Sequence, residues 1–154
     1  MKHLVPEFEK LRERFPAGFE SSVVRPCLRR IQGDRGYVAD SDIEELAVFL
    51  GVPQIQIEEV LSFYTQFRRK PIGRWHLQFC HNVSCSMNGA ERILERVEQR
   101  LGIRPGETTP DGRYTLSVVE CLGSCGTAPM MMVNEGYHEN LTHARVDELL
   151  EGLK

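Results

Sequence analysis

Four cysteines in two close pairs are the feature that most constrains the fold of this chain. Four residues separate Cys80 from Cys85, and three separate Cys121 from Cys125. Each pair comes directly after a stretch of alternating apolar residues, which predicts that each pair lies in a loop at the end of a strand. Two such loops at neighbouring strand ends can bring four thiolates together. We therefore expect a fold that places these two strands side by side.

Four thiolates suit either a tetrahedral zinc ion or an iron-sulfur cluster. Structural zinc sites favour separations of two residues, whereas separations of four and three residues form wider loops that suit two irons better. Gly123 and Gly126 allow backbone N–H groups to approach bridging sulfides, and a helix expected after Cys85 would direct its positive end toward an anionic site. His81 is directly beside Cys80, so histidine ligation is not expected. The pattern favours a cluster, with a zinc-stabilised interaction module as the alternative.

Other uses of cysteine fit the sequence less well. A thioredoxin-type dithiol needs a separation of two residues, which neither pair has. Five cysteines, an odd number, in a chain large enough to bury a core do not suggest a disulfide-stapled secreted module. The fifth, Cys27, falls on the apolar face of an expected helix and is predicted to be a packed structural thiol. We expect an intracellular protein.

Charge and hydropathy exclude several other classes of protein. The 154 residues carry a net charge of -3, which gives no broad positive field for nucleic acid. Residues 44–57 have helix-turn-helix character, but residues 54–62, where a recognition helix would lie, contain Glu58 and Glu59 and no Lys or Arg. A helix-turn-helix regulator is therefore the weaker alternative. No apolar stretch approaches 18 residues, so no direct membrane insertion is expected.

The first 70 residues are predicted to form a helical bundle. Apolar residues recur at helical spacing over 8–15, 21–32, 41–50 and 54–63. Gly33 and Gly36 are expected to end the second helix, and Ser41 with Glu44 is expected to form a capping box at the start of the third. The basic segment 68–73, which contains Pro71 and Gly73, predicts a boundary between a helical region at 1–70 and a second domain at 71–154.

Residues 71–154 combine strands with helices. Strands are expected at 74–79, 114–119 and 129–133, with a short one at 137–138, because apolar residues alternate there. A helix is expected over 88–101, capped by Asn88 and Glu91, and a last helix opens at Thr142. A strand and a helix followed by a hairpin and a closing helix form a thioredoxin-like order. The predicted fold class is α+β, with a helical bundle before a thioredoxin-like α/β domain.

The cysteine pattern and its surroundings resemble the NuoE-type 2Fe-2S subunits of respiratory complex I, NADH:quinone oxidoreductase. The resemblance is carried by Phe79-Cys80, by Glu120-Cys121-Leu122-Gly123-Ser124-Cys125-Gly126-Thr127-Ala128-Pro129 and, in the helical half, by Leu61-Ser62-Phe63-Tyr64-Thr65-Gln66-Phe67. It spans almost the whole chain. It implies a thioredoxin-like domain that binds one 2Fe-2S cluster through Cys80, Cys85, Cys121 and Cys125.

The resemblance also implies partners and a place in the cell. It implies assembly with a larger flavoprotein subunit that binds NADH, FMN and a 4Fe-4S cluster, with residues 1–70 as a docking region. The chain has no Gly-rich nucleotide-binding turn, so FMN and NADH are expected only on that partner. The expected function is single-electron transfer in the NADH dehydrogenase module, in the cytoplasm and peripheral to the membrane. The alternative is the equivalent subunit of an NAD-linked hydrogenase or formate dehydrogenase.

Overall fold

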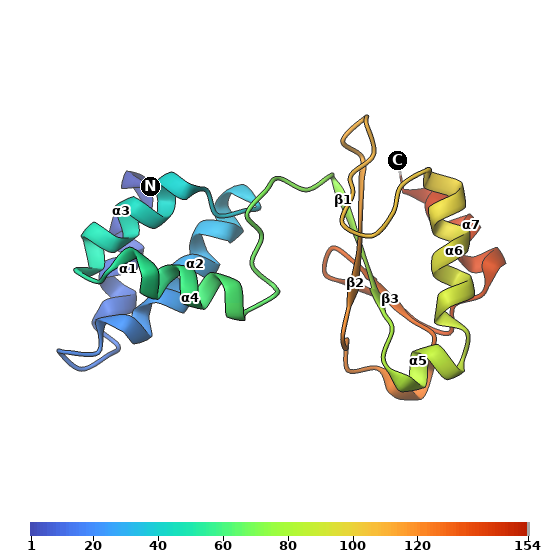
Figure 1. The fold of residues 1–154 in the computed structure, drawn as a ribbon, viewed down its shortest axis with the longest axis horizontal. Helices are drawn as coiled ribbons and strands as arrows, with labels where there is room; N and C mark the ends of the chain where they lie inside the picture. Colours follow the sequence, from blue (N-terminus) through green and yellow to red (C-terminus); the bar gives the residue numbers. More distant parts are fainter. Residues whose placement is uncertain (154) are drawn as a thin grey trace. The chain divides into compact units, whose positions relative to one another are not determined.

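The computed structural model describes residues 1–153 and divides into two compact units, Met1–Pro71 and Ile72–Lys154 (Figure 1). The first unit is helical and the second contains a four-stranded sheet with helices, so the predicted α+β class is confirmed.

The first unit consists of helices joined by short connections. Its elements are η1 (Lys2–Leu4), α1 (Val5–Arg12), α2 (Glu20–Arg35), α3 (Asp40–Leu50) and α4 (Gln54–Phe63). Each helix contributes apolar residues to one core because these residues recur at helical spacing. Residues with almost no exposed surface in this core are Phe8, Val23, Val24, Cys27, Leu28, Ile31, Leu46 and Ile57. Cys27 is therefore a packed residue of the helical core, as predicted.

Two helix ends in this unit differ from the sequence prediction. Helix α2 continues through Gly33 and ends at Gly36, whose φ of 89° is the left-handed conformation that glycine adopts without strain. Helix α3 begins at Asp40 and not at Ser41, so the predicted capping box is wrong. The buried carboxylate of Asp42 accepts a hydrogen bond from the backbone N–H of Ala39 at 2.9 Å.

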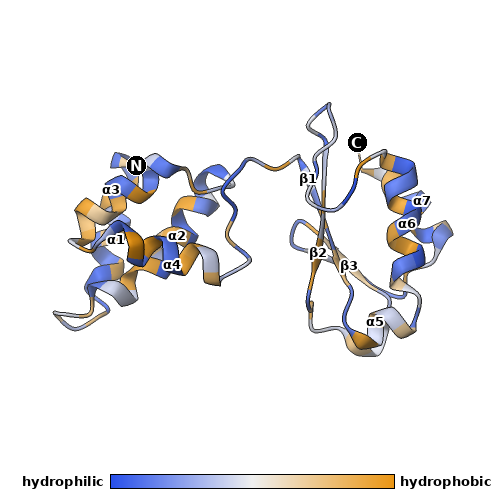
Figure 2. Ribbon diagram, viewed as in Figure 1, coloured by the Kyte–Doolittle hydropathy of each residue, from blue (hydrophilic) through white to orange (hydrophobic). Residues whose placement is uncertain are grey.

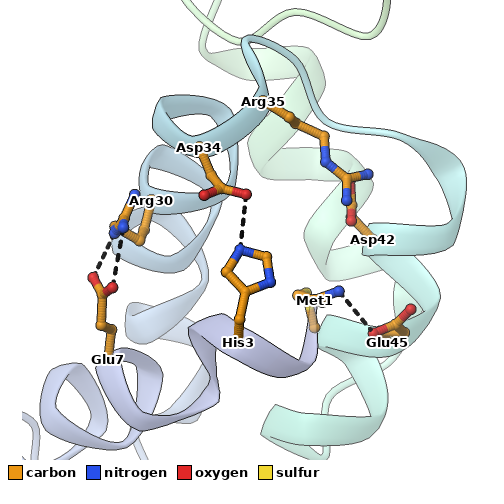
Figure 3. A network of polar contacts seen from close by, with 8 residues as sticks. All are labelled: Met1, His3, Glu7, Arg30, Asp34, Arg35, Asp42 and Glu45. Carbon is orange, nitrogen blue, oxygen red and sulfur yellow. Dashed lines mark hydrogen bonds and ion pairs between the residues drawn. The ribbon is translucent and has the colours of Figure 1, made fainter.

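Asp42 also takes part in a set of polar contacts that join the helices of this unit (Figure 3). Its carboxylate accepts a hydrogen bond from Nη1 of Arg35 at 3.1 Å, and the Asp42 side chain is only 2% exposed. Glu7 of α1 pairs with Arg30 of α2, and this contact lowers the pKa of Glu7. Most of these pairs are open to solvent, so the buried carboxylate of Asp42 is the member with the largest expected effect on stability.

The second unit is a mixed sheet with helices. Its elements are β1 (Trp75–Cys80), α5 (Val83–Met87), α6 (Ala90–Leu101), β2 (Tyr114–Val119), η2 (Cys125–Thr127), β3 (Met131–Val133), β4 (Gly136–His138) and α7 (His143–Gly152). The strand order is β2-β1-β3-β4, in which β1 and β2 are parallel and the other neighbours are antiparallel. This order agrees with the predicted thioredoxin-like arrangement.

Helices α6 and α7 lie together on one face of the sheet (Figure 1). Helix α6 has distinct hydrophobic and hydrophilic positions along its length (Figure 2). It buries Ile93 and Val97 against Leu77 and Phe79 of β1. Alternate residues of β1 point to the same face of the sheet, which explains why Leu77 and Phe79 enter this core together.

The helix predicted over residues 88–101 is wrong at its start. Asn88 and Glu91 do not cap it, because Gly89 precedes α6 with a φ of 86° and separates it from the short helix α5. Asn88 instead donates its side-chain amide to the carbonyl of Ser84 at 2.7 Å. Cys85 therefore lies inside α5, and α6 begins five residues after it.

Within residues 1–153, no helix is both long enough and apolar enough to span a membrane.

The Asp42 contacts lead to a stability prediction. We expect Asp42→Ala to lower the free energy of unfolding by about 2 kcal/mol, because it leaves the Ala39 N–H and the Arg35 guanidinium without their acceptor. The matched control is Asp40→Ala, which removes an exposed partner of Arg69 and should cost about 0.5 kcal/mol or less. Urea unfolding followed by far-UV circular dichroism measures both. Equal losses in the two variants would contradict the role given to Asp42.

Candidate metal centre

The parallel pairing of β1 with β2 brings the two cysteine pairs to one edge of the sheet. Cys80, the last residue of β1, lies opposite Val119, the last residue of β2. The pairing continues one step further, since the N–H of His81 donates to the carbonyl of Val119 at 3.3 Å. Helix α5 and the loop after β2 consequently lie at the same end of β1 (Figure 1).

The first cysteine loop holds its two thiols in a buried position. Cys80 is 3% exposed and Cys85 is 2% exposed. The backbone turns from β1 into α5 at His81 and Asn82, where the hydroxyl of Ser86 donates to the carbonyl of His81 at 2.8 Å. Both cysteines pack with Ala90 and Met130 in a small apolar cluster. The surroundings of these two sulfurs are thus nearly free of water.

The second cysteine loop is more open. Cys121 and Cys125 are both exposed, and Cys125 is the first residue of η2. Gly123 has a φ of 76°, and its N–H donates to Sγ of Cys121 at 3.3 Å. This contact matches the expected close approach of a backbone N–H to a sulfur at this glycine. An added Cβ at Gly123 or Gly126 would meet no atom within 4 Å, so space remains beside both glycines.

Polar contacts connect the two loops directly. The hydroxyl of Ser84 in α5 donates to the carbonyl of Cys125 at 2.9 Å. Sγ of Cys80 lies 3.8 Å from the carbonyl of Glu120, the residue before Cys121. Nε2 of His81 lies 3.4 Å from a carboxylate oxygen of Glu120. The structure therefore brings the two predicted loops together.

Burial and neighbouring sulfurs shape the acidity of Cys85. Burial raises the pKa of its thiol to about 11, and a hydrogen bond with Cys80 acts in the same direction. A backbone hydrogen bond with Met130 lowers this pKa, and the charges of Cys80 and Cys125 raise it. Crowded thiols resist ionisation in this way until a cation neutralises the resulting thiolates.

The residues present fit an iron-sulfur cluster by their chemistry. Four cysteines supply the thiolate donors that such clusters use, two apolar walls shield Cys80 and Cys85, and a backbone N–H already points at Cys121. In the part of the chain that the structure describes, residues 1–153, no group of three or more His, Cys, Asp or Glu side chains is close enough to hold a single metal ion. The four-cysteine ligand set remains a prediction.

Several polar side chains around the second loop carry no clear signal in the sequence. Ser124 and Thr127 both donate a hydrogen bond to the carboxylate of Glu139, which lies between β4 and α7. The hydroxyl of Tyr137 donates to the carbonyl of Leu122 at 3.1 Å. Hydroxyl residues on both sides of Cys125 indicated a need for hydrogen-bond acceptors, but only the fold identifies Glu139 as that acceptor.

A family model described as "Thioredoxin-like [2Fe-2S] ferredoxin" matches residues 8–154, nearly the whole chain. This chain belongs to the thioredoxin-like [2Fe-2S] ferredoxin family. The resemblance predicted from the cysteine pattern is confirmed, and the match includes both units of the ferredoxin chain.

Curated relatives of this ferredoxin carry names from one enzyme complex. It is 47% identical over 148 residues to the E 2 subunit of NADH-quinone oxidoreductase from Rhizobium meliloti (strain 1021), a match that covers 96% of this chain and 87% of the relative. It is 42% identical over 142 residues to NADH-quinone oxidoreductase subunit 2 of Thermus thermophilus, which covers 92% of this chain and 78% of the relative. The corresponding E-type protein of the same complex from Escherichia coli (strain K12) is 42% identical over 128 residues, covering 83% and 77%.

A solved structure shares the fold. The ferredoxin matches part of an NAD⁺-reducing [NiFe]-hydrogenase in the air-oxidized state, with a TM-score of 0.71 and 25% identity. The match covers 82% of this chain and 22% of the hydrogenase chain, so the ferredoxin spans about a fifth of that longer chain. The similarity includes the class that the sequence indicated as the alternative.

The difference in burial among the cysteines predicts their reactivity in cluster-free protein. We expect iodoacetamide at pH 8 to modify Cys121 and Cys125 first, because both are exposed. Cys27 should stay unmodified, because burial raises its pKa to about 12 and leaves only about one thiol in ten thousand ionised at that pH. Mass spectrometry of proteolytic fragments measures each site. Unfolded protein in guanidinium, in which all five cysteines should react, is the control; early modification of Cys27 in folded protein would contradict its buried position.

Proposed function

We propose that this chain is the 2Fe-2S electron-transfer subunit of the NADH dehydrogenase module of an NADH:quinone oxidoreductase. The observation that supports it most is the junction of the two cysteine loops, joined by the Ser84 to Cys125 hydrogen bond, in a ferredoxin 47% identical to a component of NADH-quinone oxidoreductase. We propose Cys80, Cys85, Cys121 and Cys125 as the ligands. A bound 2Fe-2S cluster would supply the chemistry, by taking up and releasing one electron at a time.

The protein's own residues would set the conditions for that transfer. Cys80 and Cys85 must lose their thiol protons on binding iron, and the raised pKa of Cys85 means that protons are released when the site is filled. The N–H of Gly123 at Cys121 would stabilise negative charge on that sulfur. Met130, Ala90 and Leu122 exclude water from the buried side of the site.

The exposed side of the site gives access to a partner. Cys121 and Cys125 are at the surface, so a redox centre on another chain could approach them without moving the buried cysteines. The chain has no Gly-rich turn for a dinucleotide, so hydride transfer from NADH would belong to a larger flavoprotein partner carrying FMN and a 4Fe-4S cluster. On this proposal, the chain is part of an oxidoreductase but has no complete active site alone. Its place would be peripheral to the membrane on the cytoplasmic side, held there by partner subunits.

A second candidate function rests on the hydrogenase structure. The TM-score of 0.71 and the 25% identity support an equivalent role in the NAD-linked part of a hydrogenase or a formate dehydrogenase. The 42–47% identity to subunits of NADH-quinone oxidoreductase favours the first candidate. The subunits that copurify with the endogenous protein distinguish the two.

Cluster content tests the proposed ligands. Anaerobically purified protein should contain about two irons and two acid-labile sulfides per chain, as four thiolates with bridging sulfides require. Cys121→Ser should lose most of this content, whereas Cys27→Ser should retain it because Cys27 lies in the helical core. Chemical analysis of iron and sulfide measures both variants. Stoichiometric zinc without sulfide, in protein produced with ample iron, would overturn the proposal.

We also propose that residues 1–70 dock the flavoprotein partner. Val48 of α3 and Ile55 and Phe63 of α4 are exposed apolar residues, with Val48 85% and Phe63 78% exposed. Solvent exposure of such large apolar side chains is typical of surfaces that another protein covers.

Substitution of these residues tests the docking proposal. In the full chain, Ile55→Ser with Phe63→Ser should weaken binding to the flavoprotein about tenfold or more, because truncated apolar anchors lose most of their contribution. Cluster content should not change. The control is Phe19→Ser, which alters an exposed apolar residue just before α2. Calorimetric titration measures the affinities, and an unchanged affinity in the double variant would refute this docking surface.

A further inference from the structure

Glu139 is joined to the second cysteine loop by two hydrogen bonds that converge on one oxygen. Its Oε1 accepts from Oγ1 of Thr127 at 2.6 Å and also from Oγ of Ser124. Ser124 directly precedes Cys125, and Thr127 follows it by two residues. One carboxylate from the segment between β4 and α7 therefore holds the chain on both sides of Cys125.

We propose that Glu139 is a positioning residue for the candidate cluster: it fixes the loop of Cys121 and Cys125 and places a negative charge beside it. This inference rests on the proposed function, because it concerns the same four cysteines. It adds a residue outside both loops to the group that determines how the cluster is held and how readily it is reduced.

The first argument concerns the hydroxyl protons. Ser124 and Thr127 each have one hydroxyl proton to donate. Their oxygens lie 2.8 Å apart, and both have the Glu139 carboxylate as an acceptor. Thr127 has the carbonyl of Ser124 at 3.2 Å as a second acceptor. Protons engaged in this way are not available to a sulfur atom, so Glu139 keeps two nearby donors away from the cluster.

The second argument concerns charge. Hydrogen bonds from Ser124 and Thr127 lower the pKa of Glu139, so the carboxylate is ionised at neutral pH. A fixed negative charge near a redox centre opposes the uptake of an electron and lowers its reduction potential. Glu139 would act against the N–H of Gly123, which stabilises negative charge at Cys121.

Other contacts hold the same backbone and allow Glu139 to be changed without loss of the fold. The N–H of Asn140 donates to the carbonyl of Thr127 at 2.8 Å, and that of Leu141 donates to the carbonyl of Pro129 at 2.9 Å. Tyr137 reaches the carbonyl of Leu122 from β4. These bonds do not involve the Glu139 side chain, so they remain in its variants.

Two substitutions in the full chain separate hydrogen bonding from charge. Glu139→Gln keeps an oxygen that can accept from both hydroxyls but removes the charge, whereas Glu139→Ala removes both. Each is compared with wild type after anaerobic cluster assembly. The controls are Glu135→Gln and Glu135→Ala, which alter an exposed glutamate in the turn between β3 and β4.

The measurements are the rate of iron loss to a chelator, the reduction potential by redox titration, and the electron paramagnetic resonance spectrum of the reduced protein. Glu139→Gln should lose iron at the wild-type rate but have a higher reduction potential. Glu139→Ala should lose iron about fivefold faster, because the loop loses two charge-assisted hydrogen bonds, and should have an altered spectrum. The Glu135 variants should match wild type in iron loss and in the spectrum, with a smaller change in potential than Glu139→Gln.

A combined variant tests whether Glu139 acts through the two hydroxyls. Ser124→Ala with Thr127→Val should accelerate iron loss as Glu139→Ala does, and adding Glu139→Ala to it should have little further effect, because the partners share one interaction. Additive effects would overturn the inference, as would a wild-type potential in both Glu139 variants. A wild-type protein that assembles no iron and sulfide would instead refute the proposed function, and this inference with it.

Discussion

The parallel pairing of β1 with β2 is the constraint on which the candidate site depends. Because Cys80 lies opposite Val119, the residues that follow both strands leave the sheet at the same edge. A shift of one residue in this register would turn Cys80 and its neighbours to the opposite face and separate the two loops. The core beneath α6, with Leu77 and Phe79 buried, fixes the register, so the packing of the sheet and the placement of the cysteines have one cause.

The site combines a buried half with an exposed half. Cys80 and Cys85 lie among apolar side chains, where an uncompensated thiolate is costly. Cys121 and Cys125 face solvent on a loop held by hydroxyl, carboxylate and backbone groups. A cluster bound between such halves would be anchored on one side and accessible to electron exchange on the other. This asymmetry is consistent with a subunit that passes electrons to or from a partner.

Much of this arrangement could be predicted from local sequence patterns. Alternation at Trp75, Leu77 and Phe79 predicts β1, and the cysteine spacing predicts two loops at strand ends. Helix α5 was missed because its five residues are too few to show a helical period, and Val83 and Met87 within it are exposed. The start of α3 was misplaced because the role of Asp42 depends on Arg35, a contact made in three dimensions. Glu139 could not be assigned from the sequence for the same reason: its partners lie 12 and 15 residues away, on another loop.

X-ray absorption at the iron edge tests the central claim most directly, because it reports the atoms bound to iron and the presence of a second metal nearby. In anaerobically prepared full-length protein, we predict an iron shell of sulfur atoms only, with a short iron to iron distance, as two irons bridged by sulfides and held by cysteines would give. In Cys121→Ser, any iron that remains should show a changed shell. A wild-type shell with nitrogen or oxygen ligands, or iron without a neighbouring metal, would contradict a cluster held between the two cysteine loops.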